Sequence, residues 1–559
     1  MINKRINILR KKFKKFNIDG YIVPKNDEFF SEYATKDRLK IISNFSGSAG
    51  LSIILKKDNY LFVDGRYSIQ AKKQSDKNFK IIEIHKSLPH KIIKDLTLGF
   101  DPSLFTSKQL NIYFGKSLRL KSIEKNLIDE IHQNKIFKTK PFFSLNNKIA
   151  GEDYKSKINK IIKILIVNKA DYLFISAPEN VAWLLNIRGN DNPNSPMPNC
   201  RLILGRDKKL YLLASKKKTL QLIRGNKLKK KQIINPKKFS SLIKLLKGNK
   251  FIIDSQSCSV LNEKIISSNF TIINKKDPCY DLKSIKNSSE INGMIKAHFE
   301  DGLAVTKFIF WIKNINKKKI TETEAQNKLE KFRKLNKNYL FPSFNTIAGA
   351  GANAAIVHYR ATKKSQKIIK KNDIFLFDSG GQYKFGTTDI TRTICFSEQQ
   401  KHIKDVFTKV LKGHIAVVLS DLRKFNTGKK IDVRARKFLK KDRLDYEHGT
   451  GHGVGFFLNV HEGPQSISKY NSVKLKEGMV LSNEPGYYKK GKYGIRIENL
   501  IYIKKNKKNI QFENLTFAPI EKNLINYNLL NKKEKDYLFK YHLNIYSKYS
   551  QFLNLKERK

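Results

Sequence analysis

The stretch FDSGGQYKFGTTDITRT, residues 377–393, places two aspartates on either side of a pair of glycine turns. The apolar run before it predicts a buried strand that reaches Asp378, and a lone carboxylate is costly to bury there unless something pairs with it. Turns at 380–381 and 385–386 can return the chain so that Asp389 comes beside Asp378. Two close carboxylates repel each other, and a divalent cation resolves that repulsion. An aspartate that caps a turn explains either residue alone, and both interpretations stay open for the pair.

Two more candidate ligands follow in glycine-rich or turn-like text. His452 lies in HGTGHGVG (448–455), where the flanking glycines allow close backbone approach and leave the imidazole unshielded. A single histidine is more often structural than a ligand, but His448 and His461 lie close by in the sequence, which favours a site. Glu484 precedes a Pro-Gly turn after an apolar strand.

The fifth candidate, Glu498, lies in the strand-like text GIRIEN (494–499). Strand alternation places Arg496 and Glu498 on one face and Ile495 and Ile497 on the other. If the isoleucine face belongs to the core, the arginine and the glutamate point into a site. A solvated charged pair on an outer strand is the equal alternative for this stretch taken alone.

Together the five candidates form an oxygen-rich set of four carboxylates and one imidazole: Asp378, Asp389, His452, Glu484 and Glu498. Such a set suits Mn²⁺, with Co²⁺, Fe²⁺ or Zn²⁺ as alternatives, because no thiolate takes part. Four carboxylates carry more negative charge than one divalent ion can offset, and two divalent ions would balance it. Two ions about 3.5 Å apart can share an activated water and polarise a carbonyl group. The sequence therefore predicts a two-metal hydrolase.

The composition is that of a globular protein with an unusual charge. The chain has 559 residues, 40% of them hydrophobic, and a formal net charge of +62 at pH 7. This length predicts about three to four units of roughly 150 residues. Basic residues are spread along the chain, and the short run KLKKK (227–231) has no interleaved aromatic residue, which favours compositional drift over a specific nucleic-acid partner. Weak, salt-dependent binding to polyanions is still expected from the charge alone.

Targeting and redox signals favour a soluble cytoplasmic protein without a membrane partner. The N-terminal text has no apolar signal-peptide core, and no later stretch reaches about 18 apolar residues without a charge. No pair of cysteines has CxxC spacing, which argues against a disulfide scaffold and against a thiolate zinc site. The four cysteines are Cys200, Cys258, Cys279 and Cys395.

Helix and strand periodicities predict two related α/β units followed by a third. Residues 1–145 have the pattern of an amphipathic helix, a short strand and a hairpin, and residues 150–286 repeat that order. Residues 287–559 contain the five candidate ligands and end in a helical tail. In that tail Tyr541 and Leu543 belong to an apolar set interleaved with lysines, which favours a helix that covers its own domain over a membrane role.

The five motifs, in this order, resemble those of the pita-bread metallopeptidases, and in particular the three-domain Xaa-Pro aminopeptidases (aminopeptidase P). The resemblance implies a mixed α/β (α+β) fold, with two creatinase-like α/β N-terminal domains followed by a pita-bread catalytic domain. SGSAG and DGRY near the start, AWLLNIRG and the helical tail extend it over nearly the whole chain. Three stretches carry it: DSGGQYKFGTTDITRT (378–393), HGTGHGVGFFLNVHEGP (448–464) and NEPGYYKKGKYGIRIEN (483–499).

The resemblance also implies a role for each matched ligand. Asp378 would bind one metal ion, and His452 and Glu484 would bind the other. Asp389 and Glu498 would bridge both ions. Glu484 would in addition act as the general base on the bridging water.

Five further residues match positions that serve the substrate or the ligands. His358 would steady the substrate and the tetrahedral intermediate, and His461 would lie near the scissile bond and the proline ring. His448 matches a third histidine of the pocket. Arg496 would orient a ligand carboxylate. Arg188 would reach the site from the second domain.

The implied activity is removal of the N-terminal residue from peptides with proline at the second position, by a homodimer. An X-Pro bond lacks the N–H group on which ordinary proteases rely. The alternative within the hydrolases is a prolidase acting on Xaa-Pro dipeptides. A pseudoenzyme that binds protein or nucleic acid is less favoured, because all five metal positions are filled. The stretch AGAGANAA (348–355) departs from the family pattern by its alanines, at the expected pocket rim.

Overall fold

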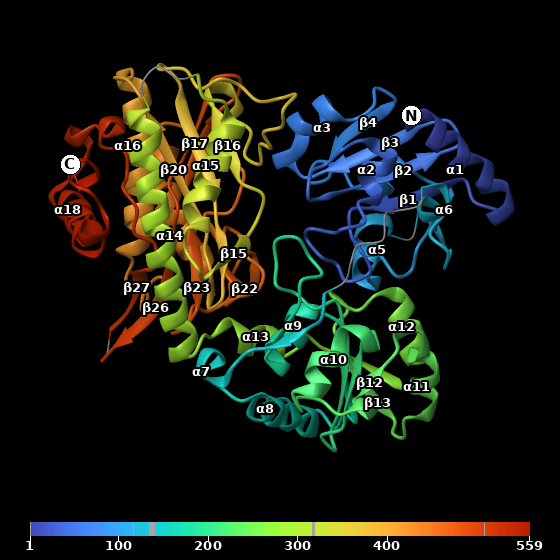
Figure 1. Cartoon of the computed structure of the whole chain (residues 1–559). Coiled ribbons are helices and arrows are strands. Elements are labelled where there is room, and N and C mark those ends of the chain that lie inside the picture. The colour runs from blue at the N-terminus through green and yellow to red at the C-terminus, as the bar shows by residue number, and fades with distance from the viewer. Residues whose placement is uncertain (1, 116, 133–139, 316–318, 508, 559) are drawn as a thin grey trace. The chain divides into compact units, whose positions relative to one another are not determined.

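A computed structural model of the whole chain (Figure 1) describes residues 2–115, 117–132, 140–315, 319–507 and 509–558. The chain folds as two compact units. The first comprises Met1–Asn147 and Glu152–Tyr280, and the second comprises Lys148–Gly151 and Asp281–Lys559. The three-domain division at 1–145, 150–286 and 287–559 stays a prediction.

The two sheets of the first unit have the same topology, with strand orders β4-β3-β2-β1-β5-β6 and β12-β11-β10-β8-β13-β14. In each sheet the central strand, β1 or β8, pairs antiparallel with a hairpin on one side and parallel with a later strand on the other. The predicted repeat of one α/β pattern is confirmed. The strands are β1 (Gly20–Pro24), β2 (Gly50–Leu55), β3 (Asn59–Val63), β4 (Phe79–Glu83), β5 (Thr97–Phe100), β6 (Arg119–Ser122), β8 (Tyr172–Ile175), β10 (Arg201–Gly205), β11 (Leu210–Leu213), β12 (Ile233–Ile234), β13 (Lys250–Ile253) and β14 (Thr271–Asn274).

Helix α1 (Ile2–Phe16) shows how apolar spacing builds this unit. Ile6, Leu9 and Phe13 recur at helical spacing and are buried in the core of the first sheet. Helix α8 (Tyr154–Val167) has the same place at the start of the second half. The other elements are α2 (Arg38–Ser43), α3 (Ser68–Gln74), α4 (Pro89–Ile92), α5 (Ser107–Phe114), α6 (Leu127–Ile131), β7 (Phe143–Ser144), α9 (Pro178–Leu185), β9 (Ile187–Arg188), α10 (Lys216–Arg224), α11 (Phe239–Leu245) and α12 (Val260–Ser267). Two helices contain residues of both units, α7 (Asn147–Ala150) and α13 (Cys279–Ser284).

The second unit combines short sheets with long helices, and α18 lies on its outer side (Figure 1). The sheets have the orders β15-β18-β19, β16-β17-β20 and β22-β21-β23-β26-β27, beside the pair β24-β25. The strands are β15 (Tyr339–Pro342), β16 (Ile347–Ala350), β17 (Ile374–Ser379), β18 (Gly381–Tyr383), β19 (Gly386–Thr387), β20 (Ile390–Cys395), β21 (Gly451–Gly453), β22 (Glu462–Ile467), β23 (Val480–Asn483), β24 (Gly486–Lys489), β25 (Tyr493–Arg496), β26 (Asn499–Asn506) and β27 (Asn509–Asn514). The helices are α14 (Ser288–Asn314), α15 (Glu322–Lys334), α16 (Lys401–Val418), α17 (Gly428–Lys440), α18 (Lys532–Tyr549) and α19 (Leu555–Arg558).

Strand β17 separates a helical core from a polar face. Phe375 and Phe377 pack with Phe308 of α14 in one apolar cluster. Because successive side chains of a strand point to opposite faces, Asp378 points away from that cluster. Strand β20 runs antiparallel to β17 and places Thr391 opposite Asp378. The apolar residues of this strand pair thus direct the carboxylate to the other face.

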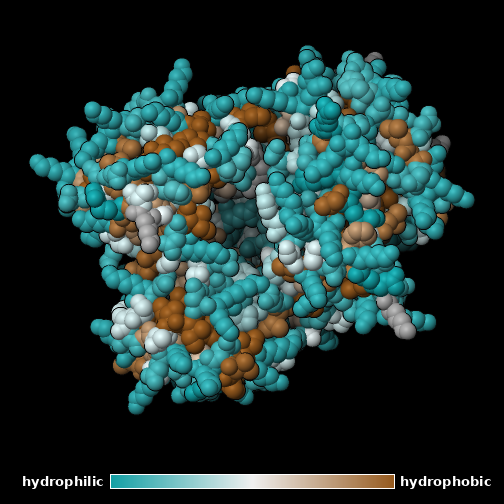
Figure 2. Space-filling view, turned by 180° about the vertical axis from the view of Figure 1, so that it is seen from behind, coloured by the Kyte–Doolittle hydropathy of each residue, from teal (hydrophilic) through white to brown (hydrophobic). Residues whose placement is uncertain are grey.

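The tail helix α18 covers its own unit, as predicted. Leu538 and Tyr541 are buried in the cluster that also contains Phe407 of α16, whereas Leu543 and Tyr546 are exposed. None of the helices in the described part of the chain is long and apolar enough to cross a membrane. Hydrophilic side chains cover most of the face seen in Figure 2, with smaller apolar patches among them.

The buried histidine of α14 makes stability depend on pH. His298 is fully buried, and its Nδ1–H donates to the Met294 carbonyl oxygen at 2.7 Å. Burial lowers the pKa of His298 from 6.5 to about 4. The unfolded chain therefore binds more protons between these two values, so this residue reduces stability as the pH falls through them.

We expect the variant His298→Gln to lose this dependence. Between pH 7 and pH 4.5 the unfolding free energy of the wild type should fall by about 2 kcal/mol more than that of the variant. Urea unfolding at both pH values measures the difference. A gap between the two proteins that is the same at both pH values would contradict the prediction.

Candidate metal centre

The five predicted ligands lie at strand ends and in the connections between strands. Asp378 is the next-to-last residue of β17, and Asp389 directly precedes β20. His452 is the middle residue of β21, and Glu484 directly follows β23. Glu498 lies between β25 and β26. The prediction of strand-like or turn-like positions is confirmed for all five.

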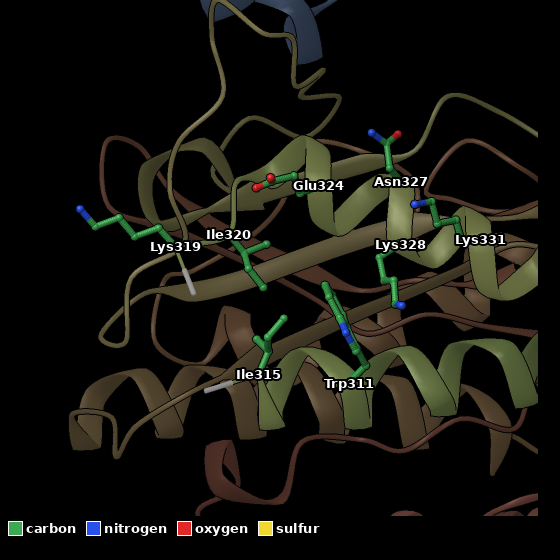
Figure 3. Close-up of a pocket in the computed structure, with 8 residues that line it drawn as sticks. All are labelled: Trp311, Ile315, Lys319, Ile320, Glu324, Asn327, Lys328 and Lys331. Atoms are coloured by element: carbon green, nitrogen blue, oxygen red, sulfur yellow. The ribbon is translucent and has the colours of Figure 1, made fainter. Parts of the chain in front are cut away.

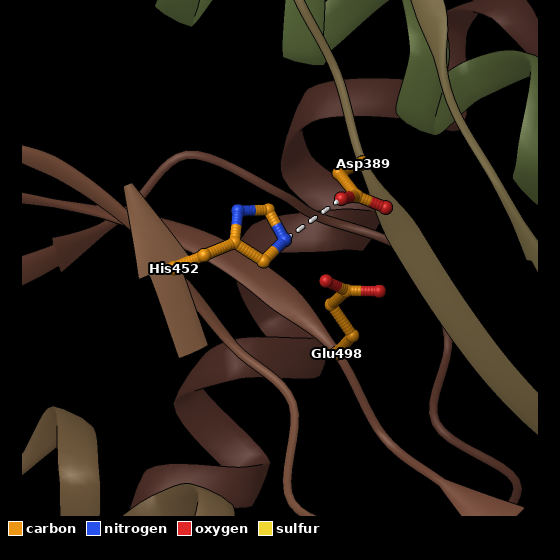
Figure 4. Close-up of side chains that lie close together, drawn as sticks. All are labelled: Asp389, His452 and Glu498. Atoms are coloured by element: carbon orange, nitrogen blue, oxygen red, sulfur yellow. Dashed lines mark ion pairs between the residues drawn. The ribbon is translucent and has the colours of Figure 1, made fainter. Parts of the chain in front are cut away.

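Three of these residues bring possible ligand atoms within 4.8 Å of one another: Asp389, His452 and Glu498. Figure 4 shows the imidazole and the two carboxylates directed at a common space. The Nε2 atom of His452 lies 3.5 Å from Asp389 Oδ2 and 3.5 Å from Glu484 Oε1. Four of the five predicted ligands therefore converge on one place.

Asp378 is tied to the same centre through Arg496. Its Oδ2 atom accepts a hydrogen bond from Arg496 Nη2 at 2.6 Å. Its Oδ1 atom is buried and has no hydrogen-bond partner among the described residues. An ionised carboxylate oxygen can only accept, so a buried one without a donor fits the role of a cation ligand. The whole donor set fits hard or borderline divalent cations.

Burial and mutual repulsion raise the pKa values of the central carboxyl groups. The pKa of Asp389 rises to about 6, chiefly through burial, and the charges of Asp378 and Glu484 add to the rise. Burial and the charges of Asp389 and Glu484 raise the pKa of Glu498 well above its usual value. Burial lowers the pKa of His452, but its bond to Asp389 and the charge of Glu484 outweigh burial and raise this pKa to about 9. Such a cluster is stable only when protons or cations offset its negative charge.

Arg496 connects two ligands through groups that the sequence reasoning missed. Its Nε–H donates to Thr391 Oγ1 at 3.0 Å, and the Thr391 hydroxyl donates to Glu498 Oε2 at 2.7 Å. Its Nη1–H donates to the Tyr488 hydroxyl at 2.7 Å. Thr391 lies two residues after Asp389, and strand alternation is the signal that could have placed it on the ligand face.

Ser482 was also missed, although it holds two ligands. Its hydroxyl donates to Glu484 Oε1 at 3.0 Å and accepts the backbone N–H of His452 at 2.9 Å. Ser482 lies two residues before Glu484, so the same alternation could have found it. A side chain at Gly451 would overlap the Ser482 carbonyl oxygen. The glycine beside His452 therefore lets β21 and β23 come close together.

The predicted substrate histidines have different surroundings. His448 Nε2 is hydrogen-bonded to the Tyr488 hydroxyl at 2.8 Å. The rings of His461 and His452 meet edge to face, with 4.3 Å between centroids and 70° between planes. His358 is half-buried in the turn that follows the short helix 351–353. The catalytic roles of these histidines stay predictions.

Arg188 belongs to the first unit, on β9. It is buried, and its Nη1 donates to the carbonyl oxygens of Ala182 at 3.1 Å and Ile187 at 2.9 Å. Its predicted reach to the metal centre stays a prediction.

A cavity of about 430 Å³ lies elsewhere in the second unit, between the end of α14 and the start of α15 (Figure 3). Trp311 and Lys328 face each other in it, with Lys328 Nζ 5.2 Å from the indole ring centre. None of the predicted site residues is among those that line it, so it does not carry the predicted chemistry. The lining residues are Trp311, Ile315, Lys319, Ile320, Glu324, Asn327, Lys328 and Lys331.

Four models of known protein regions match the chain in order. A creatinase/prolidase N-terminal domain matches residues 5–129, and a second such domain matches residues 133–290. Metallopeptidase family M24 matches residues 292–505, and the C-terminal region of peptidase M24 matches residues 508–559. The region that contains all five predicted ligands is thus the M24 region.

Curated relatives and solved structures agree with this. A probable Xaa-Pro aminopeptidase P of Laccaria bicolor is 35% identical and covers 98% of this chain and 91% of its own length. Xaa-Pro aminopeptidase 1 of Dictyostelium discoideum is 35% identical, and the match covers 97% of this chain and 92% of that protein. The X-prolyl aminopeptidase of Caenorhabditis elegans, described as a cytosolic enzyme with a di-nuclear active site, has a TM-score of 0.90 at 29% identity over 99% of this chain and 97% of its own.

A prolidase of Pyrococcus horikoshii OT3 has a TM-score of 0.53 at 26% identity and covers 66% of this chain and 99% of its own.

The α/β architecture and the converging acids define a metallohydrolase. The chain belongs to metallopeptidase family M24 and carries that family's creatinase/prolidase N-terminal domains. The family and the fold that the sequence resemblance implied are confirmed.

Cations should stabilise the folded protein, because only the folded state brings the ligands together. We expect Mn²⁺ at 100 times its Kd to add about 2.7 kcal/mol per site to the stability of chelator-stripped protein, and EDTA to reverse the gain. Calorimetric unfolding with and without Mn²⁺ measures it. Asp389→Asn should reduce the gain, whereas Asp536→Asn, at an exposed aspartate of α18, should leave it unchanged. A gain of equal size in both variants would refute this assignment of the cation site.

Proposed function

We propose that the protein is a dinuclear metallo-aminopeptidase that hydrolyses the bond between the first residue of a peptide and a proline at the second position. The observation that carries the proposal is the convergence of Asp389, His452 and Glu498, with Glu484 and Asp378 beside them, from five separate segments. Relatives of nearly the same length named Xaa-Pro aminopeptidases support it. The di-nuclear active site of the Caenorhabditis elegans X-prolyl aminopeptidase supports the use of two ions.

The ligands divide between two ions in this proposal. Asp378 would hold one ion, His452 and Glu484 would hold the other, and Asp389 and Glu498 would be shared by both. The proposed ion is Mn²⁺, because oxygen donors outnumber the single imidazole. Metal analysis of protein purified without added metal tests this choice, and stoichiometric zinc would overturn it.

Two bound ions would supply an activated water and a polarised carbonyl group. The protein supplies the base, the orientation and the substrate contacts. The Glu484 carboxylate, held at Oε1 by the Ser482 hydroxyl, accepts the proton of the attacking water. Arg496 holds Asp378 by its hydrogen bond to Oδ2. A ligand that is held in this way keeps its geometry when substrate binds.

The remaining groups serve the substrate. His461, whose ring lies beside that of His452, is proposed to contact the proline ring and the scissile bond. His358 is proposed to steady the substrate carbonyl oxygen. His448 completes the pocket from its position on Tyr488. A pocket of rings accepts the pyrrolidine without needing the N–H group that an X-Pro bond lacks.

A prolidase is the second candidate, because the Pyrococcus horikoshii prolidase shares the fold of two thirds of the chain. The two functions differ in substrate length. An aminopeptidase should cleave X-Pro-Pro tripeptides and longer peptides faster than X-Pro dipeptides, and a prolidase should do the reverse. Release of the first residue from a length series, measured with Mn²⁺, separates the two. Failure to cleave any of these peptides, together with tight polyanion binding at high salt, would favour a binding module.

The general base gives a sharper test. Glu484→Gln should lower kcat for an X-Pro-Pro peptide by at least about 100-fold, because the amide cannot take the proton. The matched control is Glu477→Gln, an exposed glutamate of the same unit, which should keep wild-type activity. An active Glu484→Gln protein would remove Glu484 from the role of base.

We further propose the three domains predicted from the sequence, at residues 1–145, 150–286 and 287–559, and a cytoplasmic location. The ranges of the matching family models support the domains, and the cytosolic enzyme of Caenorhabditis elegans supports the location. Limited proteolysis between the domains and fractionation of cells test the two proposals.

A homodimer is proposed from the family resemblance. The exposed side chains of Phe539, Leu543 and Tyr546 on α18 offer apolar surface that a partner copy could cover. Sedimentation equilibrium at micromolar concentration should return twice the mass of the chain. A mass equal to one chain across that range would exclude a stable dimer.

A further inference from the structure

The proposed metal ligand Glu498 lies outside the strand ladders. Strand β25 ends at Arg496 and β26 begins at Asn499, so neither ladder fixes the backbone of Glu498. Its N–H donates to the Thr391 carbonyl oxygen at 3.1 Å, and its carbonyl oxygen accepts from Arg392 Nη1 at 2.6 Å. These two neighbours on β20 therefore hold the backbone that presents the carboxylate.

Arg392 is fully buried and is bonded on all three nitrogens. Its Nε and Nη groups donate to neutral acceptors on its own strand and in three other segments of the unit, and no ion pair with a carboxylate is formed within the described residues. Because a guanidinium donates in one rigid plane, moving any one acceptor shifts the others. The acceptors are Pro519 O at 2.9 Å, Thr391 O at 2.8 Å, Glu498 O at 2.6 Å, Asn499 Oδ1 at 2.8 Å, Ala518 O at 2.8 Å and the Tyr541 hydroxyl at 3.0 Å.

Tyr541 brings the tail helix α18 into this network. Its hydroxyl accepts from Arg392 Nη2 and from Asn499 Nδ2 at 3.2 Å, and it lies 3.1 Å from the Ala518 carbonyl oxygen. Its ring is stacked on Phe517, with centroids 5.7 Å apart. The hydroxyl is thus placed by a rigid, buried ring. One oxygen atom of the tail touches Arg392 and also Asn499, the residue after Glu498.

We propose that Tyr541 and Arg392 are positioning residues for the metal centre, through which the C-terminal helix holds Glu498 in its ligand position. The inference rests on the proposed role of Glu498 as a ligand. Thr391 holds the Glu498 carboxylate from the site face of β20, and Arg392 holds the Glu498 backbone from the opposite face. The tail is therefore part of the metal centre as well as a cover for the core.

Tyr541→Phe is the test, because it removes one hydroxyl and keeps the stacked ring. The matched control is Tyr549→Phe on the same helix. Tyr549 is also fully buried, and its hydroxyl donates to the Phe517 carbonyl oxygen at 3.1 Å, but it does not contact Arg392. Any loss that comes only from a missing hydroxyl in α18 should appear in both variants.

Mn²⁺ alone is the probe, titrated calorimetrically into chelator-stripped, full-length protein. Tyr541→Phe should weaken Mn²⁺ binding about tenfold, which is typical when a group behind a metal ligand is lost. Tyr549→Phe should stay within about twofold of wild type. With an X-Pro-Pro peptide, Tyr541→Phe should lower kcat while KM stays near wild type, and excess Mn²⁺ should restore part of the loss.

Wild-type protein that binds no Mn²⁺ would refute the ligand set and the proposed function. Wild-type protein that binds Mn²⁺ with Tyr541→Phe unchanged, or with both variants equally weakened, would refute this inference and leave the proposed function standing. Metal binding without peptide cleavage would refute the function while leaving the role of Tyr541 measurable.

Discussion

Repulsion among buried carboxylates is the constraint that organises the second unit. Asp378, Asp389 and Glu498 are all buried, and each charge must be offset where water cannot do it. Arg496 offsets Asp378 directly, at 2.6 Å, and His452 lies between Asp389 and Glu484. The remaining negative charge favours a bound cation, which is why these residues are proposed as metal ligands.

Strand β20 meets this constraint by using its two faces for different tasks. Ile390 and Ile394 join the apolar cluster beneath α14, while Thr391 bonds to Glu498 and Arg496 on the other face. Arg392 then connects the same strand to the tail helix. Residues of the core and of the candidate metal centre therefore alternate along β20. Packing on one face of the strand fixes the direction of the side chains on the other face.

The first unit follows a simpler rule, in which one local pattern is used twice. Asp19 precedes β1 and accepts the N–H of Thr97 at the start of β5. Asp171 precedes β8 and accepts the N–H of Lys250 at the start of β13. An aspartate at the equivalent position therefore connects the equivalent pair of parallel strands in each sheet. This likeness supports the sequence prediction of a repeat beyond the apolar spacing on which it was based.

The sequence alone determined the main elements and was enough to propose the ligand set. Apolar spacing located α1 and α18, and alternation assigned Arg496 and Glu498 to the face opposite Ile495, which is buried in the core. These are local properties, because periodicity and turn chemistry act within a few residues. Only the tertiary structure decided what each face meets. Thr391 meets Glu498, and Arg392 meets Tyr541, across separations of 107 and 149 residues. No local pattern encodes such a pairing, because it depends on the packing of whole strands and helices between the two partners.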